Sequence, residues 1–264
     1  MIRVLPNDRA RAIDEGEGSE AIAIPKVVLF RGLKAHCVSC NVRELCLPFG
    51  LDSDGLRALD DLISNRLRVH KGDVLYRPGD AFVALYAIRV GSFKTTVLAE
   101  DGREQVSGYH MLGDIVGLEG IGQGHHVCQA VALEDSDVCV LPFDRLEQLA
   151  HAVPQLQRNL YGALTKEIAN EHGLLLLLGS MRAEERLAVF LVNLSNRYRA
   201  RGYSSTEFVL RMTREEIGSY LGLKLETISR LFSKFQENGL IQVQGRAVKL
   251  IDFPALRHMI GEHG

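Results

Sequence analysis

The sequence predicts an α+β protein: a compact antiparallel β-roll, then one long helix, then a C-terminal winged helix-turn-helix. Three patterns support this fold class. Short β-rich segments separated by turn residues fill residues 66–142, a helical pattern follows Pro154, and two short helical patterns meet at Gly222. With 264 residues, 46% of them hydrophobic and 24% charged, the chain has the length of two globular domains.

The first part of the chain, residues 1–35, mixes charged residues, glycines and short apolar runs without a clear period. We expect a poorly ordered N-terminal arm there. The next predicted domain, residues 36–153, contains a loop with three cysteines, a short helix over residues 52–65 and the β-roll. Within the roll, Asp101-Gly102 is the strongest signal for a hairpin turn.

Residues 154–180 are predicted to form a dimerisation helix. About 25 residues of continuous helix extend roughly 38 Å, which is longer than a small β-domain needs to cover itself. Apolar and acidic residues recur at the 4-3 spacing of a two-helix seam. The predicted interface consists of Leu160, Leu164, Ile168, Glu171, Leu175 and Leu178. The alternative is that this stripe packs on the chain's own core.

Residues 181–264 are predicted to form a basic C-terminal domain, with 13 Lys or Arg against 9 Asp or Glu, whereas residues 1–180 hold 18 against 24. Thr213 and Glu216 have the spacing of a capping box, Gly222 supplies a tight turn, and residues 239–250 indicate a hairpin wing. The side chains with the chemistry for contacting bases and phosphates are Thr213, Arg214, Glu226, Thr227, Ser229, Arg230, Lys234 and Arg246. The alternative is a helical hairpin that contacts protein.

Three cysteines lie within ten residues: Cys37, Cys40 and Cys46. In a cytoplasmic chain such thiols are more often metal ligands than disulfides. Thiolates suit iron-sulfur clusters, which usually take four cysteines. The fourth is Cys128 or Cys139, and the residues alone do not separate these two. A closed zinc site made by His36 and the three loop cysteines is the alternative.

Nothing in the sequence indicates an enzyme. The motifs of P-loop, zinc-hydrolase and serine-hydrolase chemistry are missing. The chain has no run of about 18 apolar residues and no signal peptide, so we expect a cytoplasmic protein without membrane contact.

The order and spacing of several motifs resemble the CRP/FNR superfamily of bacterial transcription regulators, and within it the fumarate-and-nitrate-reduction (FNR) branch. The motifs are Cys37-x2-Cys40-x5-Cys46, Lys71-Gly72-Asp73, Pro78-Gly79-Asp80, Gly124-His125-His126, Ala183-Glu184-Glu185-Arg186-Leu187 and Glu226-Thr227-Ile228-Ser229-Arg230. The resemblance covers nearly everything after residue 35. Members of this superfamily that bind a cyclic nucleotide clamp its phosphate with an Arg of the roll, yet no Lys or Arg occurs between Arg103 and Arg145, so we expect no cyclic nucleotide here. The resemblance implies a cyclic-nucleotide-binding-like β-roll that carries an oxygen-labile [4Fe-4S] cluster, with Cys139 as the fourth ligand because Leu141-Pro142-Phe143 follow it.

The resemblance further implies an oxygen-responsive global transcription regulator of anaerobic metabolism genes. With the cluster intact the protein would be a homodimer, and in air a monomer. The dimer would bind double-stranded DNA at a palindrome similar to TTGAT-N4-ATCAA and contact RNA polymerase. The alternative is a DNA-binding regulator of the same fold with a different sensor: haem, nitric oxide, thiol redox or structural zinc.

Overall fold

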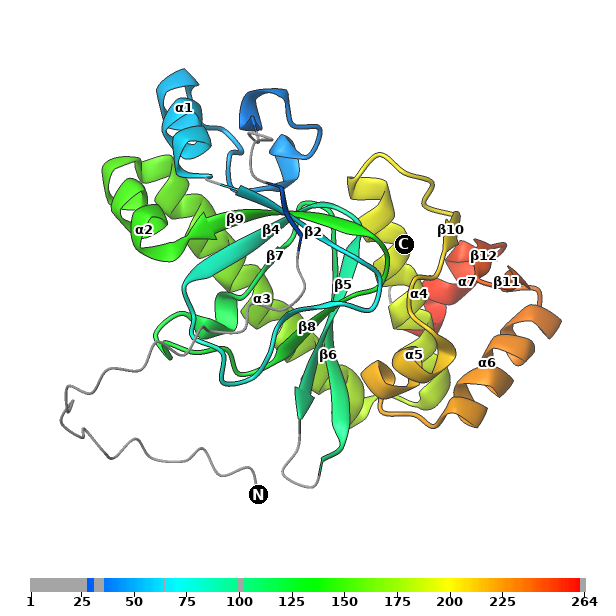
Figure 1. The fold of residues 1–264 in the computed structure, drawn as a ribbon. Helices are drawn as coiled ribbons and strands as arrows, with labels where there is room; N and C mark the ends of the chain where they lie inside the picture. The colour runs from blue at the N-terminus through cyan, green and yellow to red at the C-terminus, as the bar shows by residue number, and fades with distance from the viewer. Residues whose placement is uncertain (1–27, 31–35, 64, 99–101, 262–264) are drawn as a thin grey trace.

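The computed structural model describes residues 28–30, 36–63, 65–98 and 102–261, which form a β-roll, a long helix and a C-terminal domain (Figure 1). The roll has two antiparallel sheets. The five-stranded sheet has the order β1-β2-β9-β4-β7, with strands Val28–Phe30, Asn65–Val69, Ser136–Pro142, Ala84–Val90 and Ile115–Val116. The four-stranded sheet has the order β3-β8-β5-β6, with strands Val74–Tyr76, Gln129–Ala132, Ser92–Leu98 and Glu104–Met111.

Helices and short 3-10 turns flank the roll. They are η1 (Cys37–Ser39), η2 (Arg43–Leu45), α1 (Ser53–Leu62), η3 (Leu118–Gly120), α2 (Phe143–Ala152) and α3 (Pro154–Ser180). The predicted helix after residue 52 is confirmed as α1, which begins where Asp52 Oδ1 accepts a hydrogen bond from the Gly55 N–H at 2.8 Å. Its apolar face packs into the core shared with α2 and the first turns of α3.

The long helix α3 has 27 residues, about 40 Å at 1.5 Å per residue, and connects the roll to the C-terminal domain (Figure 1). The predicted interface stripe divides along it. Leu160 is buried, and Leu164 and Leu178 are half-buried against the chain's own cores. The roll covers the first turns and the C-terminal domain covers the last, so these three residues follow the internal-packing alternative. The outward face keeps three of the predicted residues: Ile168, Glu171 and Leu175.

The C-terminal domain is the predicted winged helix-turn-helix. Its elements are α4 (Ala183–Ala200), β10 (Glu207–Val209), α5 (Arg214–Leu221), α6 (Leu225–Glu237), β11 (Ile241–Gln244), β12 (Ala247–Leu250) and α7 (Phe253–Met259). The capping box is confirmed, because Thr213 Oγ1 accepts from the Glu216 N–H at 3.2 Å and Glu216 Oε2 from the Thr213 N–H at 2.7 Å. Gly222 ends α5 in the left-handed region at φ +64°, which allows the tight turn to α6.

The predicted N-terminal arm falls mostly outside the described residues, at 1–27 and 31–35. Within it, Val28–Phe30 forms strand β1, which the sequence patterns do not predict. This strand pairs antiparallel with β2, whose backbone groups would otherwise form an open sheet edge. At the predicted hairpin turn, Asp101 lies outside the described residues and Gly102 has φ +83°. Among the described helices, none is long and apolar enough to cross a membrane.

Candidate functional site

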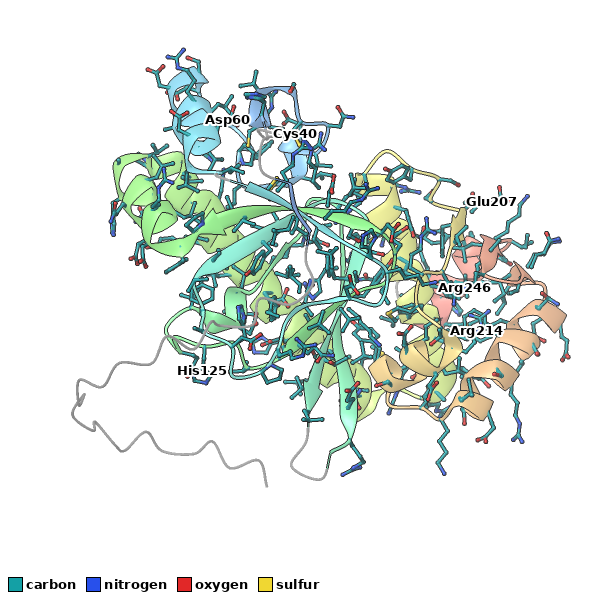
Figure 2. All side chains as sticks on the ribbon, viewed as in Figure 1. Cys40, Asp60, His125, Glu207, Arg214 and Arg246 are labelled. Atoms are coloured by element: carbon teal, nitrogen blue, oxygen red, sulfur yellow. The ribbon has the colours of Figure 1, made fainter. Side chains whose placement is uncertain are left out.

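Four of the five cysteines line one cavity between the η1–η2 loop and the five-stranded sheet: Cys37, Cys40, Cys46 and Cys139. The first three come from the loop, while Cys139 lies in the middle of β9, paired on one side with β2 and on the other with β4. All are free thiols. Figure 2 shows Cys40 and Asp60 of α1 at the top of the view, away from Arg246 at the turn of the wing. The fold therefore brings three thiols close in sequence together with a fourth from about 90 residues away.

The fifth cysteine, Cys128, lies in a different core. It is buried with Tyr76 and Ala130 inside the roll, whereas Cys37 and Cys139 share a core with α1 and α2. Burial and the neighbouring Glu119 carboxylate raise the pKa of the Cys128 thiol. The geometry thus separates the two candidates that the sequence leaves open, because of the two only Cys139 lines the cavity of the loop cysteines.

Three of the four thiols that line this cavity, those of Cys37, Cys46 and Cys139, have raised pKa values and are disfavoured as free thiolates. Burial, together with the charge of Cys139, raises the pKa of Cys46 to about 12, and burial with the charge of Cys40 raises that of Cys139 to about 11. Burial and the Asp60 carboxylate raise the pKa of Cys37 still further. Thiolates in this cavity need a compensating positive charge, and a bound metal supplies it.

The start of the cysteine loop is attached to α1 through Asp60. Its Oδ1 accepts a hydrogen bond from the Cys37 N–H at 2.5 Å, and its Oδ2 lies 3.7 Å from His36 Nδ1. The His36 ring is therefore directed at Asp60, with 60% of its side chain exposed. Among the described residues, no three His, Cys, Asp or Glu side chains come close enough to hold a single metal ion.

The end of the loop is attached to α3. Asn159 Nδ2 donates to the carbonyl oxygens of Leu47 and Phe49, each at 2.7 Å. The loop also packs against the turn between β6 and β7 through Leu45. The two backbones are so close there that a Cβ added at Gly113 would lie 2.7 Å from the Leu45 Cβ. The loop that carries the cysteines is thus in direct contact with the helix and with the roll.

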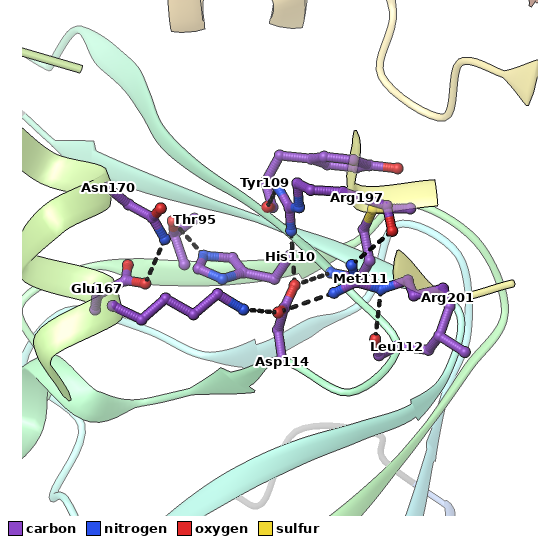
Figure 3. A network of polar contacts seen from close by, with 11 residues as sticks. Thr95, Tyr109, His110, Met111, Leu112, Asp114, Glu167, Asn170, Arg197 and Arg201 are labelled. Carbon is purple, nitrogen blue, oxygen red and sulfur yellow. Dashed lines mark hydrogen bonds and ion pairs between the residues drawn. The ribbon is translucent and has the colours of Figure 1, made fainter. Parts of the chain in front are cut away.

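Next to this contact, the buried carboxylate of Asp114 joins the roll to α3 and α4 (Figure 3). It accepts from Arg197 Nη2 at 2.6 Å, Arg201 Nη2 at 3.0 Å and Lys166 Nζ at 2.9 Å. Its Oδ2 also accepts from the Met111 N–H at 2.9 Å. Burial alone would raise the pKa of Asp114, but the three cations outweigh it and hold that pKa well below the usual range.

The second candidate surface is the outer face of α6. Glu226, Ser229 and Arg230 are exposed there, and Thr227 is half-buried. The inner face is buried in the core of the domain and consists of Ile228, Leu231, Phe232 and Phe235. The helix therefore presents one polar face to solvent, with the side-chain types that recognise base edges in the major groove.

At the start of α5, two predicted DNA-contacting residues have structural partners. Thr213 is exposed and caps the helix. The Arg214 guanidinium lies 3.2 Å from the ring centroid of Phe232, and its Nη1 is buried without a hydrogen-bond partner among the described residues. Burial lowers the pKa of Arg214 to about 10. The two N–H groups of this buried nitrogen therefore have no acceptor among the described residues.

The remaining two predicted contacts lie at the edges of the domain. Lys234 Nζ pairs with Glu184 Oε1 of α4 at 2.6 Å, so this lysine is not a free cation in the isolated chain. Arg246 is exposed at the turn between β11 and β12, where its Nη1 donates to the Arg211 carbonyl at 3.3 Å (Figure 2). Both side chains remain on the solvent side of the helix-turn-helix.

The sequence patterns do not single out three polar residues that connect the parts of the chain. These are Asn159, Asp114 and Lys94, whose Nζ pairs with Glu216 Oε1 of α5 at 2.7 Å. Each has its partner more than 50 residues away along the chain. Spacing rules act over one or two turns, and the only local signal is the i, i+4 pair Arg197 and Arg201 on the face of α4.

Comparison with known proteins matches two parts of the chain to family models. Residues 66–152 match the cyclic nucleotide-binding domain, and residues 185–259 match the Crp-like helix-turn-helix domain. The transcriptional regulatory protein Btr of Bordetella pertussis is 48% identical over 86% of this chain and 94% of its own length. The fumarate and nitrate reduction regulatory protein of Escherichia coli is 43% identical, over 87% of this chain and 92% of its own.

Two further comparisons, one of sequence and one of structure, give similar proteins. The transcriptional activator Anr of Pseudomonas protegens is 45% identical over 83% of this chain and 90% of its own. The solved structure of FixK2 from Bradyrhizobium japonicum matches with a TM-score of 0.69 at 29% identity, covering 75% of this chain and 98% of FixK2. The proteins from Bordetella, Escherichia and Pseudomonas are named as transcription regulators, so the chain is a DNA-binding transcription regulator and not an enzyme. It belongs to the CRP/FNR family, in the branch that contains the fumarate and nitrate reduction regulatory proteins.

Proposed function

We propose that this protein is an oxygen-responsive transcription regulator in which four cysteines hold a [4Fe-4S] cluster: Cys37, Cys40, Cys46 and Cys139. The observation that carries the proposal is the convergence of these four thiols on one cavity, away from Cys128. Four cysteines are the usual donor set of such a cluster, so the residues fit it. When bound, the cluster supplies reactivity toward oxygen.

Structural zinc is the alternative with a defined donor set, and the geometry does not favour it. Such a site would need the ring of His36 beside the loop thiols, whereas that ring is directed at Asp60 and is largely exposed. A cluster binds each cysteine on a separate iron atom, so it has no need for three ligands on one ion. A cavity lined by four thiols therefore matches the donor set of a cluster.

The roll is proposed to bind no cyclic nucleotide, although it matches the domain of that name. The hollow between the roll and α3 is lined by Glu119, Glu167 and Glu171, and no Lys or Arg is among its described lining residues. A cyclic phosphate is an anion, so these carboxylates would repel it. The signal is accordingly assigned to the cysteine loop.

The chain's own contacts offer a route from the cysteine loop to the dimer. The carbonyls of Leu47 and Phe49 are both held by Asn159 of α3, so a shift of the loop changes the position of the helix. The outward face of α3 carries three large hydrophobic side chains, Tyr161, Ile168 and Leu175, each more than half exposed. We assign this face to a homodimer that forms when the cluster is intact and dissociates to monomers in air.

In that dimer the two α6 helices would lie about one DNA turn apart, roughly 34 Å, and read a palindrome similar to TTGAT-N4-ATCAA. The exposed side chains of Glu226, Ser229 and Arg230 on the outer face of α6 support this assignment. Binding of this kind places the protein with DNA in the cytoplasm, where it would regulate anaerobic metabolism genes through contact with RNA polymerase.

The experiment that tests the proposal measures iron and acid-labile sulfide in anaerobically purified protein, with the molecular mass in solution before and after exposure to air. About four of each per chain, in a dimer that becomes a monomer in air, is the expected result. Zinc alone, or a dimer unchanged by air, would remove the oxygen sensor and leave DNA binding in place. A haem absorption band would assign the sensor to haem instead.

Replacing Arg230 with alanine is expected to weaken binding to the palindrome by about 1 to 3 kcal/mol and to relax the preference at one base pair, because its exposed guanidinium can bond guanine bidentately. Affinities for the palindrome, for single-base variants and for random DNA measure this. Arg246→Ala is the control and should weaken binding to all these sequences alike. Equal losses for Arg230→Ala on specific and random DNA would contradict base reading.

Replacing Glu171 with alanine is expected to raise the fraction of dimer in air. Glu171 is exposed on α3 between Ile168 and Leu175, where it would face its symmetry mate in a parallel dimer. Removing this like-charge repulsion should strengthen dimerisation by a few tenths to about 1 kcal/mol. Sedimentation equilibrium measures the change, with the exposed Glu207→Ala as control. A variant that stays as monomeric as the wild type would contradict the repulsion.

A further inference from the structure

Two helices that belong to different parts of the molecule end at the same place. The long helix α3 ends at Ser180 and the first helix of the helix-turn-helix, α5, ends at Leu221. The last carbonyls of any helix lack partners within it, and the helix dipole makes this end negative. Two such ends close together need a positively charged group with several donors.

Arg186 of α4 is that group. Its Nη2 donates to the Leu178 carbonyl at 2.8 Å and its Nε to the Met181 carbonyl at 3.0 Å, both at the end of α3. Its Nη1 donates to the Leu221 carbonyl at 3.0 Å, at the end of α5. One planar guanidinium thus caps both helices at once. Lysine has no planar fork of donors with which to hold three carbonyls in these directions.

The apolar contacts around Arg186 are equally close. A Cβ added at Gly222, in the turn of the helix-turn-helix, would lie 2.9 Å from Leu178 Cδ2 and 3.3 Å from Arg186 Nη1. Leu177 and Leu178 of α3 pack in the same core as Leu221. The turn between α5 and α6 therefore rests directly on the end of the long helix.

We infer that Arg186 is a positioning residue for DNA recognition, which fixes the direction of α6 relative to α3 and thereby sets the half-site spacing that the dimer accepts. The inference rests on the proposed function in one respect, namely that two chains dimerise through α3 and bind a palindrome. If α3 is the dimer axis, the angle between α3 and α6 determines the distance between the two recognition helices. Arg186 is the side chain that bonds to both sides of this joint.

A separate attachment keeps the helix-turn-helix on the roll when Arg186 is altered. Lys94 of β5 pairs with Glu216 at 2.7 Å, and the Val106 N–H of β6 donates to Ser219 Oγ at 2.9 Å. These contacts hold α5 toward the roll and do not involve α3. Loss of the Arg186 fork is therefore expected to loosen the joint with α3 without detaching the domain.

The test compares Arg186→Lys with the wild type on four DNA duplexes, under anaerobic conditions with iron-loaded full-length protein. Three duplexes carry the palindrome with central spacers of three, four and five base pairs, and the fourth carries a single half-site. We expect the wild type to prefer one spacing by about tenfold or more, and Arg186→Lys to bind all three within about threefold of one another. The affinity of Arg186→Lys for the single half-site, and the mass of its dimer in solution, should equal those of the wild type.

Arg199→Lys is the matched control, because Arg199 is exposed on the same helix, and it should keep the wild-type spacing preference. The preference is a ratio measured on one preparation, so a partly unfolded fraction cancels from it. An unchanged preference in Arg186→Lys overturns the inference, and so does a loss of half-site affinity as large as the loss on the palindrome. A dimeric, iron-loaded wild type without any spacing preference overturns it too and removes the palindrome, but not the sensor, from the proposed function.

Discussion

Cys139→Ser protein purified without oxygen is expected to lack the cluster and to bind the palindrome only as strongly as random DNA, about a thousandfold or more below the wild type. The physical reason is the position of Cys139 in β9, where it is the only thiol that the sheet contributes to the cavity of the loop cysteines. Without it three thiolates remain, one fewer than the usual donor set. Iron content and DNA affinity measured on one preparation check the result.

The matched control is Cys128→Ser, which removes a buried thiol from the same roll. Cys128 packs with Tyr76 in the other core, so this variant should keep its iron and its air-sensitive mass. Burying a hydroxyl in place of a thiol costs about 1 to 3 kcal/mol of stability if it finds no partner. An iron-loaded Cys139→Ser protein, or a Cys128→Ser protein without iron, would show that the fourth ligand is assigned wrongly.

Cys128 and Cys139 also show which features of the site local sequence patterns do not predict. Local patterns predict the helix-turn-helix, its capping box at Thr213 and its turn at Gly222, because each depends on residues within one or two helical turns. Cys128 directly precedes β8 and Cys139 lies within β9, and nothing local tells which of these strands lies beneath the loop. That depends on strand order, which places β9 between β2 and β4. The family resemblance implies Cys139, and the fold places Cys139 in the cavity that the loop cysteines line.

The stripe on α3 shows a second limit. A 4-3 spacing of apolar residues predicts a packed face equally well for a partner helix and for the chain's own core. The structure divides the stripe, with Leu160 buried inside and Ile168 and Leu175 exposed. The division depends on where the roll ends and the C-terminal domain begins along the helix, which no local spacing encodes. In the same way Asn159 and Asp114 acquire their roles only through distant partners.

The second large effect is expected from Asp114→Asn, which should lower the free energy of unfolding by about 3 to 5 kcal/mol near neutral pH. The carboxylate is 8% exposed and accepts bonds from Arg197, Arg201 and Lys166. The neutral amide leaves Arg201, whose side chain is 5% exposed, buried without its counter-charge. Urea unfolding of the iron-free protein measures the loss without interference from cluster chemistry.

The partners of Asp114 provide a graded control. Lys166 is 61% exposed, so solvent screens its charge, and Lys166→Ala should cost well under the loss from Asp114→Asn, about 1 kcal/mol at most. Loss of the Lys166 contact also leaves Arg197 and Arg201 of α4 paired with the carboxylate. A similar loss from both variants would mean that the link to α3 carries the effect rather than the link to α4.

The effect of Asp114 must also depend on pH in one direction. The three cations hold its folded-state pKa well below that of an unfolded aspartate, about 3.9, against the opposing effect of burial. A depressed pKa contributes stability that is complete above the unfolded value and is lost as the pH falls toward the folded value. The gap between wild type and Asp114→Asn should therefore be constant from pH 5 to 8 and shrink below about pH 4. A gap that is the same at pH 3 as at pH 7 would mean that the carboxylate acts by shape and hydrogen bonding, and that its charge does not join the roll to α4.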